Sequence, residues 1–137
     1  MLFHKLGKYS NTGTLILRLV FGLVFLFHGY LKVIDISGTA GFLSSLGVPV
    51  PLFFTIVVTA VEFLGGILLI LGLLTRLVGL LLAIDMLVAL IIVHAKNGFF
   101  IVNGGYEFVL VLMAVGVMYL LHGAGKYSLD AKLFKKH

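Results

Sequence analysis

The segment PLFFTIVVTAVEFLGGILLILGLL, residues 51–74, contains a single charged residue, Glu62, in an otherwise apolar run. A helix needs about 20 consecutive apolar residues to cross the hydrocarbon core of a membrane. An isolated strand would leave its backbone groups unpaired in lipid, so the segment is predicted to be a transmembrane helix. An ionised carboxylate is costly at that depth and normally faces the interior of a bundle. Glu62 therefore needs a partner or a function.

The composition of the whole chain agrees with a membrane protein. Of its 137 residues, 61% are hydrophobic and 11% are charged, and the mean hydropathy is +1.23. Soluble domains are about half apolar and about a quarter charged. The length fits one transmembrane domain, residues 1–137. No cysteine is present, which excludes thiolate catalysis and cysteine-ligated metal sites within the chain.

Three further apolar segments approach the length of a membrane span. Together with the first they predict an all-α integral membrane four-helix bundle. The predicted spans are residues 14–34, 51–74, 77–95 and 106–122. The first span is longer than the roughly 7–15 apolar residues of a signal-peptide core, and no small-residue cleavage pattern follows it, so we expect it to be retained.

The connections have distinct compositions. Residues 35–51 are predicted to form a short interfacial helix, capped by Thr39. Its apolar side would consist of Phe42, Leu43 and Leu46. The connection after residue 74 is tight, so the second and third spans should be antiparallel neighbours. Residues 96–106 hold turn signals around an apolar centre, which favours a loop that dips into the membrane or a small hairpin.

Basic residues are concentrated on one side of the predicted bundle. That side carries Lys5, Lys8, Arg76, Lys126, Lys132, Lys135 and Lys136, whereas the other carries Lys32 and Lys96. The positive-inside rule places the basic side, with both termini, in the cytoplasm. The basic tail, residues 123–137, suits an anionic lipid surface. The net charge of +5 is thus explained by a lipid bilayer partner, and no nucleic-acid partner is expected.

Ionisable groups recur inside the spans at two depths, estimated from a rise of about 1.5 Å per residue. The inner layer is Arg18, Glu62 and Asp85. The outer layer is His28, Lys32, His94 and Glu107, with Asn103 nearby. In the first span, steps of three and four place Arg18, Phe21, Phe25, His28 and Lys32 in one stripe. Such groups usually face the bundle interior or a water-filled cavity.

Two spacings bear on how the spans pack. Gly65, Gly72 and Gly79 recur every seven residues, which suits close approach of helices. Asp85 and His94 are nine residues apart, about half a turn out of phase at 3.6 residues per turn. They would face one cavity only if the helix were kinked or if His94 belonged to the following loop. We assign His94 to the loop.

The charged groups also have structural interpretations, which the sequence leaves open. Arg18 would form a buried ion pair with Glu62 or Asp85 that fixes the helix register. Lys32 would extend to the outer headgroups. Either interpretation removes these residues from any chemistry.

The same holds for the outer residues and the aromatic stripe. His94 would be an interfacial histidine that donates to a carbonyl, and Glu107 would favour a helix N-terminus. Phe21 and Phe25 would pack the core rather than line a site. Paired histidines in a four-helix bundle can also hold haem. No Glu-x-x-His spacing accompanies His28 and His94, so haem is the weaker hypothesis, and no metal site is predicted.

Several motifs in order along the chain resemble the DoxX family, within the wider DoxX/DoxD-like group. They are RLVFGLVFLFHGYLKV at 18–33, VEFLGGILLILGLLTR at 61–76, MLVALIIVHAKNGFF at 86–100, NGGYE at 103–107 and YSLDAKL at 127–133. The resemblance implies four helices in a bacterial or archaeal cytoplasmic membrane. Some relatives are subunits of a thiosulfate:quinone oxidoreductase, and others are implicated in oxidative-stress complexes or in quinone and catechol resistance.

Taken with the polar groups inside the spans, the resemblance implies a quinone-linked membrane oxidoreductase or a subunit of one, acting in oxidative or quinone stress defence. The expected catalytic residues are His28, Glu62 and His94. The expected residues of the quinone site are Arg18, Phe21, Phe25, Lys32, Asp85, Phe99, Phe100, Asn103 and Glu107. A quinone needs an apolar, aromatic slot and a proton route, and histidine exchanges protons near neutral pH. Haem and flavin stay open as further cofactors.

Two other functions compete with this prediction. The chain would be a module that binds or transports a small amphiphile, with two copies forming a homodimer. Alternatively it would anchor soluble redox enzymes at the cytoplasmic face through Arg76 and the basic tail. The sequence leaves the electron donor and acceptor undetermined.

Overall fold

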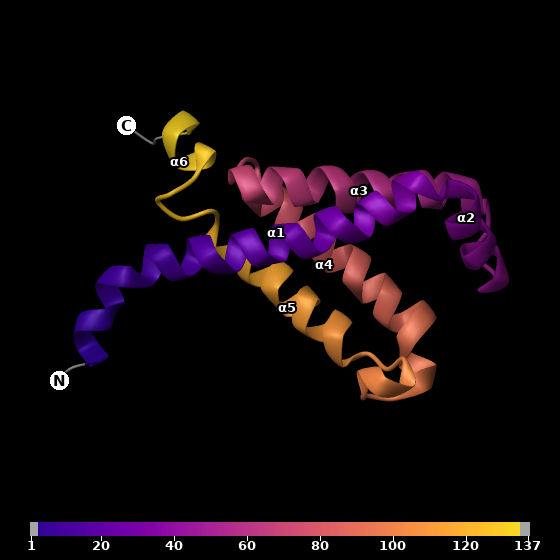
Figure 1. Cartoon of the computed structure of the whole chain (residues 1–137). Coiled ribbons are helices and arrows are strands. Elements are labelled where there is room, and N and C mark those ends of the chain that lie inside the picture. Colours follow the sequence, from indigo (N-terminus) through magenta and orange to yellow (C-terminus); the bar gives the residue numbers. More distant parts are fainter. Residues whose placement is uncertain (1–2, 135–137) are drawn as a thin grey trace.

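Four long helices form two antiparallel pairs in the computed structural model, which describes residues 3–134 (Figure 1). One pair is α1 (Ser10–Ile34) with α3 (Pro51–Leu71), and the other is α4 (Thr75–Ala89) with α5 (Glu107–His122). Short helices α2 (Ile36–Ser45) and α6 (Leu129–Leu133) flank them, and a 3₁₀ segment, Phe3–Tyr9, precedes α1. The predicted all-α membrane bundle is confirmed. The last residues of the predicted basic tail, Lys135 and Lys136, lie outside the described residues.

Three continuous helical stretches are long and apolar enough to cross a membrane. They are Phe3–Ile34, Pro51–Leu71 and Thr75–Asn97. The fourth predicted span, α5, has 16 residues, which gives a length of about 24 Å at 1.5 Å per residue. It is therefore shorter than a full span of about 20 residues.

Glycines hold α1 directly against α3. A Cβ built on Gly66 would lie 2.5 Å from the backbone nitrogen of Leu26, and one on Gly22 would lie 3.0 Å from the carbonyl oxygen of Gly66. The two backbones therefore touch without intervening side chains, as small residues permit in membranes. Gly29 meets the backbone of Phe63 in the same way. These contacts fix the register of the pair.

Glycines also bring α4 close to α5. The three glycines of the seven-residue repeat, Gly65, Gly72 and Gly79, each have a different structural role. A Cβ on Gly79 would lie 2.7 Å from the carbonyl oxygen of Gly116. A Cβ on Gly65 would lie 3.3 Å from Cγ1 of Val78 in α4. Gly72 instead ends α3 with a left-handed φ of 68°, a conformation that glycine adopts at little cost.

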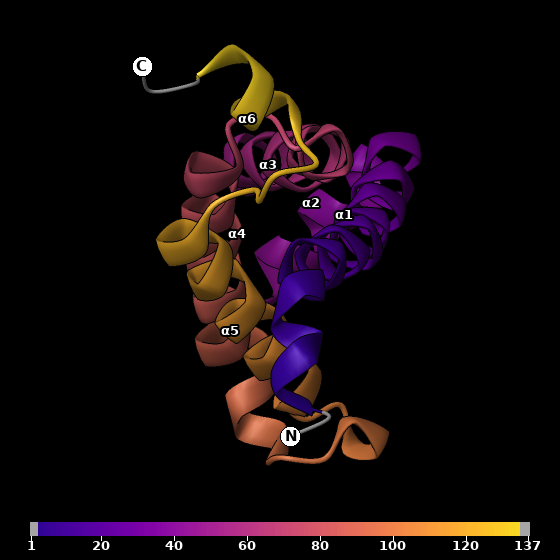
Figure 2. The same ribbon diagram turned by 90° about the vertical axis from the view of Figure 1, so that its left-hand side faces the viewer.

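The segment after α5 connects the N-terminal half of α1 to the beginning of α4 (Figure 2). Arg18 is 1% exposed, and its Nη1 and Nη2 donate to the carbonyl oxygens of Ala124 and Tyr127, the latter at 2.7 Å. The carboxylate of Asp130 accepts from the backbone N–H groups of Leu74 at 2.7 Å and Thr75 at 2.9 Å. The described part of the tail is thus a folded clasp that holds the first turn of α4.

The contacts of Asp130 allow a test of whether the clasp stabilises the protein. Leu74 has a φ of 53°, which is strained for a residue with a side chain. Asp130→Ala removes both acceptors from the turn and is expected to destabilise the protein by about 1–2 kcal/mol, as loss of a helix cap does. Trypsin should also cut faster after Lys126. The exposed neighbour Lys132→Ala serves as control. Equal unfolding temperatures and cleavage rates for both variants would contradict the clasp.

Candidate functional site

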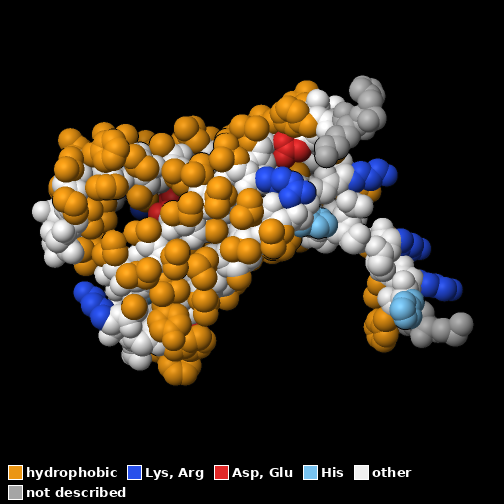
Figure 3. Space-filling model, turned by 180° about the vertical axis from the view of Figure 1, so that it is seen from behind, with side chains coloured by type: hydrophobic (Ala, Val, Ile, Leu, Met, Phe, Trp, Pro, Cys, Tyr) orange, Lys and Arg blue, Asp and Glu red, His pale blue; other side chains and the backbone are white. Residues whose placement is uncertain are grey.

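The two helix pairs separate toward the end that carries α2, and a cavity of about 740 Å³ lies between them. It is formed by α1, α2, α3, α4, the turn that follows α4, and the first part of α5. Most of its lining is apolar, and it includes the four rings of Phe25, Phe42, Phe54 and Phe108. Figure 3 shows the hollow from outside with an acidic side chain beside it. Its volume is in the range of about 300–1,000 Å³ that is usual for small-molecule sites.

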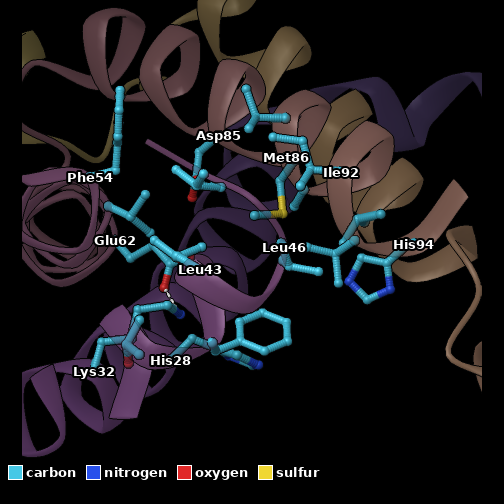
Figure 4. Close-up of a pocket in the computed structure, with 18 of the residues that line it drawn as sticks. His28, Lys32, Leu43, Leu46, Phe54, Glu62, Asp85, Met86, Ile92 and His94 are labelled. Atoms are coloured by element: carbon cyan, nitrogen blue, oxygen red, sulfur yellow. Dashed lines mark hydrogen bonds and ion pairs between the residues drawn. The ribbon is translucent and has the colours of Figure 1, made fainter. Parts of the chain in front are cut away.

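Three charged side chains from three helices meet at one end of the cavity (Figure 4). Lys32 Nζ of α1 lies 2.6 Å from Glu62 Oε2 of α3. Asp85 of α4 lines the same end of the cavity, and its Oδ2 is buried without a hydrogen-bond partner among the described residues. One cation therefore stands opposite two carboxyl groups. The ion pair gives Glu62, whose side chain is 6% exposed, a partner of opposite charge.

The partner of Glu62 differs from the one predicted. Arg18 bonds to the carbonyls of the clasp, and no ion pair joins it to Glu62 or Asp85 within residues 3–134. Depth counted from the span ends placed Arg18 in the same inner layer as Glu62, but the contact of Gly29 with Phe63 sets Glu62 nearly level with Gly29 instead. Lys32 lies one turn beyond and extends back to the carboxylate rather than to the headgroups.

Both histidines line the cavity and hydrogen-bond to backbone carbonyls. His28 Nδ1 lies 2.7 Å from the carbonyl oxygen of Val24, one turn earlier in α1. His94 Nδ1 lies 2.8 Å from the carbonyl oxygen of Gly104. Since a carbonyl only accepts, Nδ1 carries the hydrogen in each ring, and Nε2 is left for other partners.

A turn of π-helix explains how His94 and Asp85 come to line the same cavity. The helix that begins at Thr75 continues through a π-helical segment, Leu90–His94, and then a 3₁₀ turn, Ala95–Asn97. A π turn inserts extra residues per turn and shifts the phase of the side chains that follow. Our assignment of His94 to the loop was therefore wrong. Turns of this kind are frequent at functional sites.

Two predicted site residues of α1 lie outside the cavity lining. Arg18 lies in the clasp, as described above. Phe21 is buried in the core, stacked on Tyr119 of α5 with ring centroids 5.9 Å apart and packed edge-on against Phe25 at 5.0 Å. Phe25 contacts both the core and the cavity. The predicted stripe therefore begins in the core and ends at the site.

The predicted residues of the 98–107 turn also lie outside the cavity lining. Glu107 is the first residue of α5, and its Oε1 accepts from the N–H of Ile101 at 2.7 Å. Phe99 and Phe100 pack edge-on with centroids 5.4 Å apart. Asn103 ends a 3₁₀ turn, Ile101–Asn103, rather than lying in a hairpin strand. The turn brings the carbonyl oxygen of Gly104 to His94 Nδ1.

One wall of the cavity was assigned to the membrane surface by the sequence. Thr39, Phe42 and Leu43 of α2 line the cavity, together with Leu46, which follows the helix. The cap of α2 is Asp35, whose Oδ1 accepts from Gly38 N–H at 2.9 Å, and not Thr39. Helical spacing identified the apolar side, but spacing cannot distinguish a side that faces lipid from one that faces a cavity.

The described residues contain no group of three or more histidine and acidic side chains able to hold a metal ion. His28 and His94 both line the cavity, each with one ring nitrogen engaged by a carbonyl. The site is thus an apolar chamber with a charged end and two imidazoles on its walls. Fold and site together define an integral membrane protein with a ligand-sized cavity inside its helical bundle.

Comparison with known proteins agrees with this class. The chain belongs to the DoxX family, whose model matches residues 13–95. It is 36% identical to "Putative oxidoreductase CatD" of Bacillus subtilis over 95% of this chain and 93% of that protein. It is 34% identical to "Uncharacterized membrane protein Rv3486" of Mycobacterium tuberculosis, over 98% and 88% of the two chains.

A third relative, "Inner membrane protein YqjF" of Escherichia coli, is 27% identical over 94% of this chain and 98% of that protein. No solved structure gives a significant match. The relatives are bacterial proteins, two of them named as membrane proteins. With the apolar helices, they make this chain a membrane protein embedded in a lipid bilayer.

Proposed function

We propose that this protein is a quinone-linked membrane oxidoreductase subunit that holds a quinone-like molecule in the cavity between its two helix pairs. The observation that carries the proposal is the cavity itself, about 740 Å³, apolar and aromatic along its walls and charged at one end. A lipophilic ring with two polar oxygens matches such a chamber, because the walls bury the ring and a few polar groups orient it. The name of the Bacillus subtilis relative supports redox chemistry.

The residues of the chamber have separate roles in this proposal. Phe25, Phe42 and Phe54 contact the ring and tail. Lys32, Glu62 and Asp85 form the polar end, where the ring oxygens exchange hydrogen bonds and protons. An intramembrane cluster of this kind is the usual place for a proton relay.

The proposal is tested by filling the cavity. Val58 lines the cavity from α3, whereas its neighbour Val57 does not and is exposed on the outside of the helix. Purified wild-type protein should bind a short-tailed ubiquinone or menaquinone analogue saturably, at one site per chain. Val58→Trp should weaken that binding at least tenfold, equivalent to about 1.4 kcal/mol. Val57→Trp should leave it unchanged.

The alternatives predict different results. Absence of saturable binding by wild-type protein would refute the quinone proposal. If the protein binds quinone analogues and carries them across proteoliposome membranes without redox turnover, it is a transport module. Recruitment of soluble enzymes that depends on residues 126–137 and not on Val58 would favour the anchoring function.

The wider setting follows from the same proposal. The protein would lie in the cytoplasmic membrane of a bacterium or archaeon with both termini inside, because Lys8, Arg76 and Lys126 lie near the same end of the bundle. A soluble redox partner would meet it at that face. Quinone is the proposed cofactor, with haem and flavin left to direct spectroscopy of the purified protein.

A further inference from the structure

The polar groups that line the cavity are mostly hydrogen-bond acceptors. Nδ1 of His28 and Nδ1 of His94 both donate to backbone carbonyls. The neutral ring has one hydrogen, so Nε2 of each is an acceptor. Thr39 Oγ1 donates its hydrogen to the carbonyl oxygen of Asp35 at 3.0 Å. Each of these three side chains thus lines the cavity with its hydrogen already engaged.

The backbone around the cavity gives the same result. The N–H groups of Gly47 and Val48 donate to Ser44 and Leu43, and that of Gly104 donates to Ile101. Gly105 donates to Phe100, and Ile101 donates to the Glu107 carboxylate. None of the lining N–H groups in these turns is therefore left for a ligand.

At the charged end, donors are also fewer than acceptors. Lys32 lines this end with a donor group, and its charge is opposed by Glu62 at 2.6 Å. The Asp85 carboxyl has a buried oxygen with no partner in the described part of the chain. A buried acceptor without a hydrogen bond is unfavourable, and a ligand that supplies the hydrogen removes that cost. A ligand hydroxyl would do so.

We infer that the cavity binds its ligand in the reduced, hydroxylated form, a hydroquinone, and that Asp85 accepts a hydrogen bond from one of its hydroxyls. The inference rests on the proposed function and adds the redox form. A quinone brings two carbonyl acceptors to a site already rich in acceptors, whereas a hydroquinone brings two donors. The second hydroxyl donates its single hydrogen to the free Nε2 of His28 or to that of His94.

The test compares three ligands with the same ring and tail under anaerobic conditions. They are decylubiquinol, decylubiquinone and the dimethyl ether of the quinol, which keeps the oxygens but has no donor. The quinol should bind about tenfold more tightly than either of the others, as expected when one buried acceptor gains its hydrogen bond. This comparison uses wild-type protein alone and so does not depend on how a variant folds.

Asp85→Asn tests the assigned residue. The amide is nearly isosteric with the carboxylate but adds N–H donors, so the preference for quinol over quinone should fall to about one or reverse, since the loss of about tenfold corresponds to that one bond. The control Ile91→Val, on the exposed side of the same helical segment and outside the cavity lining, changes no hydrogen bond and should leave the preference intact.

The outcomes separate the inference from the proposal beneath it. If wild-type protein binds quinol, quinone and ether equally, or binds quinone best, the inference is overturned while quinone binding stands. A preference for quinol that persists in Asp85→Asn overturns the assignment of Asp85. If none of the three ligands binds, the proposed function itself fails.

Discussion

Gly29→Ala should prevent α1 from docking against α3 and so prevent the protein from assembling. A Cβ at Gly29 would lie 2.5 Å from the Cα of Phe63 and 2.8 Å from its Cβ, so the two backbones would have to separate. Forcing extra atoms into a packed interface costs about 1–3 kcal/mol or more, and here neither helix can relieve the contact by turning a side chain. We expect loss of at least about 3 kcal/mol, observed as aggregation in size-exclusion chromatography in mild detergent.

The same helix offers a matched control. Gly13 also lies in α1, but a Cβ there meets no atom within 4 Å. Gly13→Ala should therefore be neutral or stabilising by up to about 1 kcal/mol, because alanine favours helix more than glycine does. If Gly29→Ala and Gly13→Ala give the same chromatogram and the same unfolding temperature, the close contact of α1 with α3 does not hold the bundle.

The helices themselves were predictable because apolar length is a local property. The predicted spans at 14–34, 51–74 and 106–122 agree with α1, α3 and α5 to within four residues at each end. The third predicted span ends at residue 95, where the π turn and the 3₁₀ turn replace regular helix. Local composition does not specify such a change of helical pitch, so the phase of His94 was missed.

The partners of the charged groups were not predictable, because they depend on the relative shift of one helix against another. Counting from the ends of the spans assumes that all helices start in one plane. In the structure α1 begins at Ser10, four residues before the start of the predicted span at residue 14, so that assumption fails. The side chain of Lys32 is also long enough to bridge a full helical turn. Gly22, Gly29 and Gly66 carried the information on register, but only the packed helices show which backbones they meet.

The contacts of the clasp and the place of α2 in the cavity wall were not predictable for a different reason. Both involve short segments whose role is set by what they cover. The motif YSLD, residues 127–130, contains Ser128, which caps α6 by accepting from Ala131 N–H at 3.1 Å, and Asp130, which holds the turn after α3. A serine followed by an aspartate is a recognisable cap signal in the sequence. Its attachment to a turn 55 residues earlier is not.

Lys32→Met should destabilise the protein by about 3 kcal/mol, the lower end of the cost of removing one member of a buried ion pair, because the lysine side chain is 24% exposed. Methionine retains the length and much of the apolar stem, so the change is mainly the loss of the charge. Glu62, whose side chain is 6% exposed, would then face Asp85 with no cation in contact, and two carboxyl groups would share an apolar chamber. The measurement is the free energy of unfolding in detergent. Exposed Lys96→Met is the control, expected within about 0.5 kcal/mol of wild type.

The double variant Lys32→Met with Glu62→Gln separates stability from function. Removing both charges of a buried pair is often nearly neutral, so most of the stability lost in Lys32→Met should return. Failure of Glu62→Gln to restore stability would show that Lys32 does not act through Glu62. If the restored protein binds the quinol as tightly as wild type, the Lys32–Glu62 pair stabilises the fold and takes no part in binding. A restored protein that has lost binding would place Lys32 and Glu62 in the site itself, which is the outcome we expect because both side chains line the cavity.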